Sequence, residues 1–160
     1  MKYILIGAGN RGMTYGQWAV SHGIEIAAVA ELRPDRLKDA ANKLLVPENM
    51  CFTDAADVLA LGKIADAAII ATMDAEHYVP AMKAIELGYN LLLEKPVAQT
   101  AKECADIASA ANKKGVKILV CHVLRYPPFF GKIKQLLMDG VIGEVMSLEQ
   151  TEAVGHIHYS

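Results

Sequence analysis

A glycine-rich turn near the N-terminus has residue types and a spacing suited to binding a dinucleotide. The motif G-x-G-x-x-G follows the apolar run 3–6, and a helix-compatible stretch continues to residue 22. In such a turn the first glycine permits a tight bend, the second lets the backbone approach a pyrophosphate, and the third lets the helix pack closely on the strand. Free N–H groups at the start of the helix would meet the phosphates. The pattern predicts a nicotinamide-dinucleotide site, in preference to a simple glycine turn, formed by Gly7, Ala8, Gly9, Asn10, Arg11 and Gly12.

Two charged residues after the next apolar run bear on which dinucleotide is bound. Glu31 follows the run 24–30, where a carboxylate would accept hydrogen bonds from the ribose hydroxyls of NAD and repel the 2′-phosphate of NADP. Arg33, two residues further on, would instead meet that phosphate. Because the acid stands at the end of the strand itself, the sequence favours NAD as cofactor and leaves NADP as the alternative.

These residues must be positioned by an alternation of short apolar runs and helical patterns. Such an alternation is typical of a parallel sheet with helices on both faces. We predict strands at 2–6, 24–30, 50–53, 66–71, 89–93 and 116–120, and helices at 11–22, 34–45, 54–61, 77–87 and 100–114. Helix signals support these ranges: Pro34 in a first turn, capping-box spacing from Thr100 to Glu103, and C-terminal glycines at Gly88 and Gly115. The predicted fold class is α/β, a doubly wound parallel sheet of the Rossmann type over residues 1–122.

The pattern changes after Val120. Pro127 and Pro128 interrupt the chain, residues 129–139 have a helical pattern, and residues 145–151 alternate like a strand exposed on one face. A single strand cannot make an independent sheet. We therefore expect residues 123–160 to be a connecting helix and the first strand of an incomplete second α/β domain.

Composition narrows the class of protein. The 160 residues carry a net charge of −2, and their 53% hydrophobic content is ample for a core. This charge gives no reason to expect a nucleic-acid or membrane partner, and the apolar runs are shorter than a membrane span. We expect a cytoplasmic protein without a signal peptide, whose three cysteines, Cys51, Cys104 and Cys121, stay reduced. We expect no metal site, since His156 and His158 have no evident carboxylate or cysteine partner nearby.

Three further segments complete a pattern that resembles a known family. Residues 72–77 follow the fourth predicted strand, Glu94-Lys95-Pro96 follows the fifth, and residues 122–128 follow the sixth. Together with the glycine-rich turn, they resemble the glucose–fructose oxidoreductase/inositol dehydrogenase/MocA family of NAD(P)-dependent oxidoreductases, over nearly the whole chain. The resemblance implies a second α/β domain, built on a large open sheet, that holds most of the substrate site. We also expect a homo-oligomer formed through that second domain.

The resemblance implies roles for individual residues. Lys95 would point at the reacting carbon as the catalytic residue, instead of being a solvated loop lysine, and the peptide bond before Pro96 would be cis. An ammonium group there would stabilise the alkoxide charge that develops during the reaction. His77 is either close to the nicotinamide or a helix-start residue satisfied by backbone, and Arg125 either contacts cofactor or substrate or pairs with a surface carboxylate. The remaining residues expected to bind the cofactor are Thr72 and Glu94.

The expected function is hydride transfer between nicotinamide and a secondary alcohol or carbonyl carbon of a sugar, polyol or related metabolite. The family supplies its proton acceptor, a histidine in an Asp-x-x-x-His segment, from the second domain, and this chain has no such segment. The chain alone is therefore expected to be inactive. The alternatives are a non-catalytic NAD(H)-binding sensor or regulatory module, and a nucleotide-binding domain whose catalytic portion lies on another chain.

Overall fold

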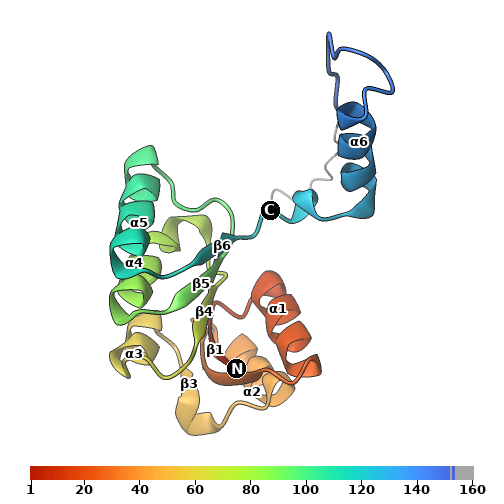
Figure 1. Cartoon of the computed structure of the whole chain (residues 1–160). Coiled ribbons are helices and arrows are strands. Elements are labelled where there is room, and N and C mark those ends of the chain that lie inside the picture. The colour runs from red at the N-terminus through yellow and green to blue at the C-terminus, as the bar shows by residue number, and fades with distance from the viewer. Residues whose placement is uncertain (152, 154–160) are drawn as a thin grey trace. The chain divides into compact units, whose positions relative to one another are not determined.

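The computed structural model describes residues 1–151 and 153, and the chain divides into two compact units, Met1–His122 and Val123–Ser160. The first unit alternates strands and helices along its length (Figure 1). Its strands are β1 (Lys2–Ile6), β2 (Glu25–Ala30), β3 (Cys51–Phe52), β4 (Ala67–Ile70), β5 (Asn90–Leu93) and β6 (Ile118–Val120). Its α-helices are α1 (Asn10–Ser21), α2 (Pro34–Leu44), α3 (Ala55–Ala60), α4 (Tyr78–Leu87) and α5 (Ala101–Lys114), and two 3-10 helices span Glu48–Met50 and Asp74–Glu76.

The strands form one parallel sheet in the order β3-β2-β1-β4-β5-β6. This is the predicted doubly wound α/β fold. Every predicted strand and helix of this unit is present, with ends displaced by at most two residues, as is usual where helices and strands fray. The largest displacement is in β6, which begins at Ile118.

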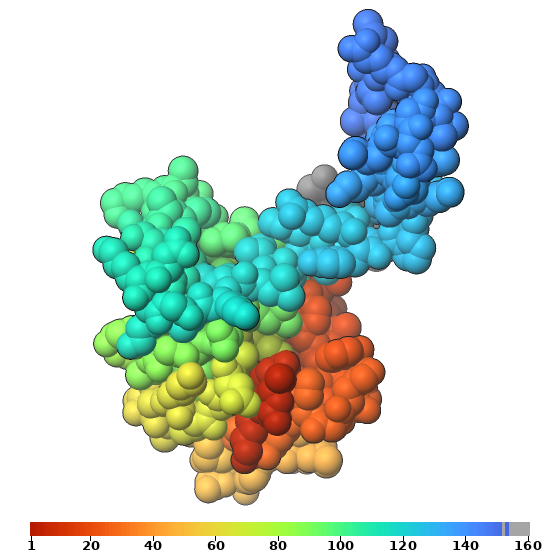
Figure 2. Space-filling model, in the orientation of Figure 1, coloured from red at the N-terminus to blue at the C-terminus, as the bar shows by residue number. Residues whose placement is uncertain are grey.

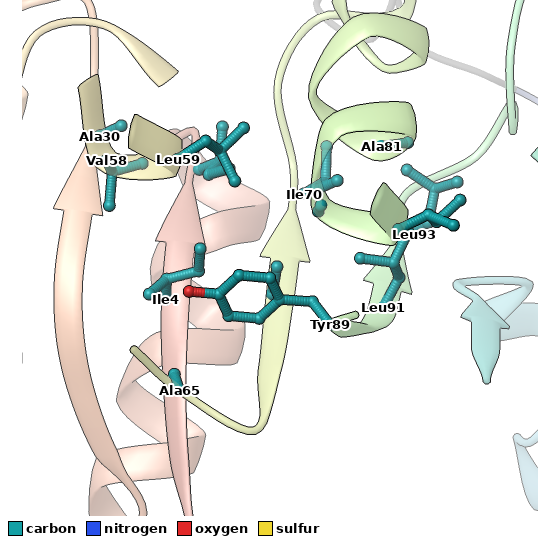
Figure 3. Packing of buried hydrophobic residues seen from close by; sticks show 14 of the residues in the cluster. Ile4, Ala30, Val58, Leu59, Ala65, Ile70, Ala81, Tyr89, Leu91 and Leu93 are labelled. Carbon is teal, nitrogen blue, oxygen red and sulfur yellow. The ribbon is translucent and has the colours of Figure 1, made fainter. Parts of the chain in front are cut away.

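The core lies on both faces of the sheet because alternate residues of a strand point to opposite sides. In β1, Ile4 and Ile6 join a cluster with α3, α4 and α5, whereas Leu5 joins a second cluster with α1 and α2. Figure 3 shows the first cluster, in which Tyr89 reaches toward Ile4. The Tyr89 hydroxyl donates to the carbonyl of Gly62 at 2.8 Å. Figure 2 shows one face of the molecule as a space-filling view, coloured in chain order. Apart from Lys2 at the start of β1, the central strands β1 and β4 are apolar because both of their faces are covered.

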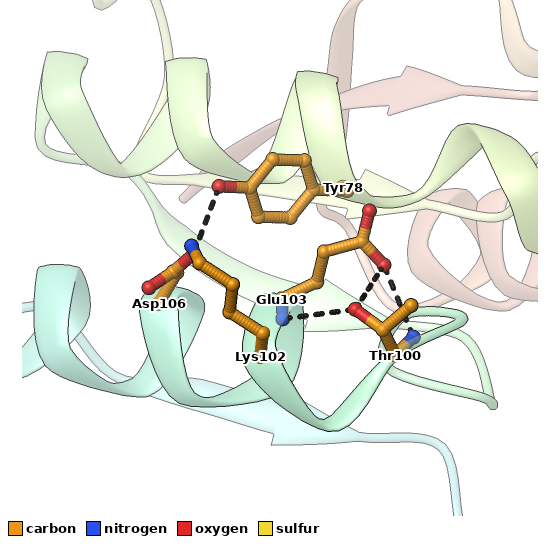
Figure 4. Close-up of polar contacts among 5 residues, drawn as sticks. All are labelled: Tyr78, Thr100, Lys102, Glu103 and Asp106. Carbon is orange, nitrogen blue, oxygen red and sulfur yellow. Dashed lines mark hydrogen bonds and ion pairs between the residues drawn. The ribbon is translucent and has the colours of Figure 1, made fainter.

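Local signals in the sequence set the helix ends of this unit. Thr100 and Glu103 form the predicted capping box, in which each side chain bonds to the other residue's backbone amide (Figure 4). Gly88 and Gly115 end α4 and α5 with φ values of 87° and 73°, in the left-handed region that favours glycine. Figure 4 also shows Tyr78 of α4 directed at Asp106 of α5, which joins the two helices.

The second unit contains a 3-10 helix, Val123–Arg125, and α6 (Pro128–Met138). The helix expected at 129–139 is present, but the strand expected at 145–151 is not, since those residues have no regular secondary structure. Alternation favours a strand only where a neighbouring strand satisfies its backbone groups, and the described residues of this unit contain no other strand. A search of the described residues for helices with the length and apolar character of a membrane span found none.

Candidate functional site

The carboxyl ends of the strands bring most of the predicted site residues to one edge of the sheet. The chain order of the strands reverses between β1 and β4, and open α/β sheets bind ligands at such a reversal. The glycine-rich turn follows β1, Thr72 lies two residues beyond β4, and Glu94 follows β5 directly. Because these three strands are neighbours in the sheet, their following turns lie side by side.

Close backbone packing requires glycine at Gly7 and Gly12. Gly7 has φ +88°, and a Cβ there would lie 2.5 Å from the carbonyl oxygen of Ala71. A Cβ at Gly12 would lie 1.9 Å from the carbonyl oxygen of Gly7, so α1 packs directly on the turn that precedes it. The fold itself therefore requires both glycines, in the tight bend and in the helix contact that the motif predicted.

Gly9 differs from the other two glycines of the motif because the space beside it is open. Its backbone has φ −68° and ψ −172°, which other residues adopt, and a Cβ would meet only the Arg36 guanidinium, at 3.8 Å. Gly9 and Asn10 line a cavity of about 370 Å³ together with Arg36, Asp35 and one further ion pair of α2. Helix α1 begins here, and no side chain within residues 1–151 caps it. An open cradle, unpaired amides at a helix start and a cation fit the pyrophosphate of a dinucleotide.

Glu31 ties the glycine-rich turn to the end of β2. Its buried carboxylate accepts a hydrogen bond from the Ala8 amide at 2.8 Å through Oε2, and one from the Arg33 amide at 3.1 Å through Oε1. Each carboxylate oxygen has a second lone pair for a ribose hydroxyl. Glu31 therefore stands at the predicted place and is itself held by two backbone amides.

The guanidinium of Arg33 is directed at Asp35. Its Nη2 lies 2.7 Å from one Asp35 oxygen and its Nε lies 3.2 Å from the other, and both side chains are more than half exposed. Arg33 holds the pKa of the Asp35 carboxyl below its usual range. A 2′-phosphate would have to compete with this carboxylate for Arg33, which favours NAD.

The Glu94-Lys95-Pro96 turn is held from two sides. Glu94 is buried, and its Oε2 accepts a hydrogen bond from the Lys95 amide at 2.9 Å. The ring of His77 has Nδ1 2.6 Å from the carbonyl oxygen of Pro96 and Nε2 3.2 Å from that of Thr72. The Lys95–Pro96 peptide bond is cis, as the family resemblance implied, and the Lys95 side chain is exposed. The turn thus presents an ammonium group at the sheet edge on a fixed backbone.

The arrangement changes the role expected of His77. Its side chain is fully buried, and both of its ring nitrogens face backbone carbonyls. Of the two roles considered, the structure therefore favours a histidine satisfied by backbone over a direct contact with the cofactor. We assign His77 to the support of the Lys95 turn, because it joins that turn to the segment after β4.

Tyr15 is a site residue that sequence reasoning missed. It lies on α1, and its hydroxyl donates to Oε1 of Glu94 at 2.5 Å. Burial and this hydrogen bond raise the pKa of Tyr15 well above its usual range, so the hydroxyl remains a donor. The buried thiol of Cys121, whose own pKa is raised by burial, lies beside it. The signal in the sequence was its position three residues after Gly12, on the helix face that packs on the sheet.

Arg36 was also missed. It lies in the first turn of α2 and faces the cavity beside Gly9, and it has no ion-pair partner among residues 1–151 and 153. Sequence reasoning considered Arg33 as the partner of a 2′-phosphate and gave Arg36 no role. The helical geometry of α2 turns Arg36 toward the glycine-rich turn, where it faces the cavity beside Gly9.

The other predicted residues have less defined surroundings. Arg11 is exposed in the first turn of α1, and its charge lowers the pKa of Cys121, against the larger effect of burial. Arg125 is exposed in the second unit, so its contact with cofactor or substrate stays a prediction. His156 and His158 lie outside the described residues, and within those residues no group of three metal-ligating side chains occurs.

The first unit matches a known protein family. Residues 1–122 match the model of the oxidoreductase family with an NAD-binding Rossmann fold. An oxidoreductase of Formosa agariphila is 35% identical over 124 residues, covering 78% of this chain and 38% of the relative. An inositol 2-dehydrogenase/D-chiro-inositol 3-dehydrogenase of Lactiplantibacillus plantarum is 28% identical over 130 residues, covering 79% and 36%.

A solved structure agrees with the fold. The crystal structure of an oxidoreductase from Agrobacterium radiobacter, in complex with NAD⁺, L-tartaric acid and magnesium, superposes with a TM-score of 0.78 at 25% identity, covering 90% of this chain and 42% of the other. The chain thus spans about two fifths of the length of the proteins it matches. Since the family model covers the entire first unit, this chain belongs to the glucose–fructose oxidoreductase/inositol dehydrogenase/MocA family of oxidoreductases with an NAD-binding Rossmann fold.

Proposed function

We propose that this chain is the cofactor-binding part of an oxidoreductase that transfers hydride between NAD and a secondary alcohol or carbonyl carbon of a sugar, polyol or related metabolite. One observation carries the proposal: the open cradle at Gly9 and the Lys95 turn lie at the same edge of one sheet. The inositol dehydrogenase relative supports the substrate class. NADP remains the alternative cofactor.

Different residues of the chain would bind different parts of NAD. The amides at the start of α1, with Arg36 beside them, would hold the pyrophosphate, and Glu31 would accept the ribose hydroxyls. The bound cofactor supplies the carbon that takes or gives up hydride. The ammonium of Lys95 would donate to the substrate oxygen and stabilise the negative charge that grows on it during transfer.

The proton acceptor would come from a second domain. We propose that residues 123–160 begin that substrate domain, and that the chain by itself turns over no polyol because the histidine expected to accept the proton lies in the remainder of the domain. In this proposal the second domain holds most of the site for the small-molecule substrate, and copies of the protein associate through that domain.

The proposed function is tested by binding and turnover measured separately. Calorimetric titration of the chain with NAD⁺ should show one site, and the full-length protein should reduce NAD⁺ when supplied with a member of a panel of sugars and polyols. Absence of NAD⁺ binding would contradict the proposal. Binding without turnover of any member in the full-length protein would favour the non-catalytic sensor instead.

Cofactor choice should depend on the charge of Glu31. We expect Glu31→Gln to weaken NAD⁺ about tenfold, because a hydrogen bond from a ribose hydroxyl to a charged group contributes roughly 1–1.5 kcal/mol more than one to a neutral amide oxygen. NADP⁺ affinity should fall less, since the repulsion of its 2′-phosphate is lost as well. Glutamine keeps one oxygen for the Ala8 amide, so this variant disturbs the turn less than alanine would. Calorimetric titration with both cofactors measures the ratio of their affinities.

A matched variant addresses Arg33. Asp35→Ala removes the carboxylate that engages the Arg33 guanidinium and should improve NADP⁺ binding more than NAD⁺ binding, because both cofactors carry the pyrophosphate but only NADP⁺ carries the 2′-phosphate. A wild-type protein that prefers NADP⁺, and loses that preference in Arg33→Ala, would show that Arg33 and not Glu31 selects the cofactor.

A further inference from the structure

A single side-chain contact connects the helix that would hold the pyrophosphate with the turn that carries the lysine. The hydroxyl of Tyr15 on α1 lies 2.5 Å from Oε1 of Glu94, and Oε2 of the same carboxylate lies 2.9 Å from the Lys95 amide. One oxygen of Glu94 thus bonds to a side chain of α1, and the other bonds to the backbone of the lysine turn. Glu94 is 6% exposed, so water competes little for either oxygen.

Because Tyr15 lies on α1, this contact links the expected pyrophosphate site to the lysine turn. The first turn of α1 borders the cavity at Gly9, and Tyr15 stands a little more than one helical turn further along. Since a short helix moves as one body, a shift of the first turn of α1 would shift the Tyr15 hydroxyl with it. Through Glu94, that hydroxyl meets the backbone of Lys95.

The fold does not need the Tyr15 hydroxyl to hold α1 on the sheet. Gly12 and Gly16 bring the helix close, since a Cβ at Gly16 would lie 2.9 Å from a methyl group of Leu44 and one at Gly12 would meet the backbone of Gly7. Loss of the hydroxyl alone would leave this packing in place. Loss of the hydroxyl would instead remove a hydrogen bond that restricts the orientation of the Glu94 carboxylate.

We propose that Tyr15 is a positioning residue that acts through Glu94 to set the place of Lys95 relative to the dinucleotide. This inference rests on the proposed function, because it assumes that NAD binds at the start of α1. The hydroxyl orients the carboxylate, the carboxylate holds the Lys95 amide, and the exposed ammonium is thereby kept at a defined distance from the helix that holds the cofactor. Tyr15 itself touches neither cofactor nor substrate in this scheme.

Hydrogen exchange at single amides tests the proposal on the chain itself. In Tyr15→Phe the Lys95 amide should exchange about tenfold faster than in the wild type, because its acceptor is no longer fixed. The Ala8 amide is the internal reference, since it also donates to a buried carboxylate, that of Glu31, and should keep its rate. Saturating NAD⁺ should slow exchange at Lys95 in the wild type and much less in Tyr15→Phe.

Tyr89→Phe is the matched control. It removes another tyrosine hydroxyl, one that donates to the carbonyl of Gly62 and accepts from the amide of Ile64 at the opposite end of the sheet, and should leave the Lys95 amide unaffected relative to Ala8. Equal acceleration at Lys95 and Ala8 in Tyr15→Phe would mean that the hydroxyl contributes only to overall stability, and would overturn the proposal. Unchanged exchange at Lys95 would overturn it as well.

A second variant and a binding measurement keep the outcomes separate. Glu94→Gln leaves one carbonyl oxygen for two donors and should accelerate exchange at Lys95 similarly, whereas the double variant with Tyr15→Phe should add little. Additive effects would show that the two residues act independently and contradict the proposal. If calorimetry finds no NAD⁺ binding by the wild type, the proposed function fails, while exchange at Lys95 without NAD⁺ still decides whether Tyr15 orders the turn.

Discussion

Replacing Lys95 by methionine is expected to lower the turnover of the full-length protein roughly 100- to 1000-fold, the usual cost of losing one preorganised donor to a developing oxyanion. Methionine has an apolar stem of about the same length as that of lysine and lacks the ammonium. The Lys95 amide still donates to Glu94, and the exposed side chain has no ion-pair partner in the described part of the chain. Melting temperature and NAD⁺ affinity should therefore change little, so that the loss appears in kcat.

The control for Lys95 is a lysine at the other edge of the sheet. Lys117 is exposed and directly precedes β6, so Lys117→Met changes the net charge equally, away from the carboxyl ends of the strands. Its turnover should equal that of the wild type. Lys95→Arg retains a cation but cannot place it at the same point, and should recover only part of the rate. Full activity of Lys95→Met would show that Lys95 is an ordinary loop residue.

Replacing Gly9 by valine is expected to weaken NAD⁺ binding roughly 10- to 100-fold with little change in stability. The added side chain would occupy the cradle where the pyrophosphate lies, and overpacking of this kind costs about 1–3 kcal/mol. In the free protein the same side chain has room, since a Cβ at Gly9 meets nothing closer than the Arg36 guanidinium at 3.8 Å. Calorimetric titration and thermal unfolding of the same preparation measure the two effects.

Gly12→Ala is the informative comparison for Gly9→Val. Its Cβ would lie 1.9 Å from the carbonyl oxygen of Gly7, so α1 must shift, and we expect more than about 3 kcal/mol of lost stability from a methyl group alone. The two glycines of one motif thus separate a requirement of the ligand from a requirement of the fold. Undiminished NAD⁺ affinity in Gly9→Val would show that the dinucleotide does not bind at this turn.

The fold was predictable because its signals are short-range. The two-residue period of Ile4, Leu5 and Ile6 assigns side chains to opposite faces of a strand, and the capping box of Thr100 and Glu103 depends only on residues within one helical turn. The strand expected at 145–151 failed for the complementary reason. Alternation is a local property, but a strand needs a pairing partner that its own residues cannot supply.

The candidate site was predictable in its residues and less so in their roles. Gly7 and Gly12 have the close backbone contacts that their spacing indicated, whereas Glu31 bonds to the Ala8 amide and its contact with a ribose stays a prediction. His77 is different, because its two carbonyl partners come from turns after separate strands, and only their adjacency in the sheet buries the ring. The surroundings of Arg33 were not predicted either, since its guanidinium forms an ion pair with the exposed Asp35.

The order of strands and helices, the glycine turn with its acid, and the family could all be inferred from the amino-acid sequence, because they depend on backbone preferences and spacings within short segments. The contact of Tyr15 with Glu94, 79 residues away, and the contact of Glu94 with the Lys95 amide became apparent only in the folded chain. Contacts of this kind arise when distant elements pack against one another. The free energy of burying a polar group then selects its partner from whatever the fold has brought within hydrogen-bonding distance.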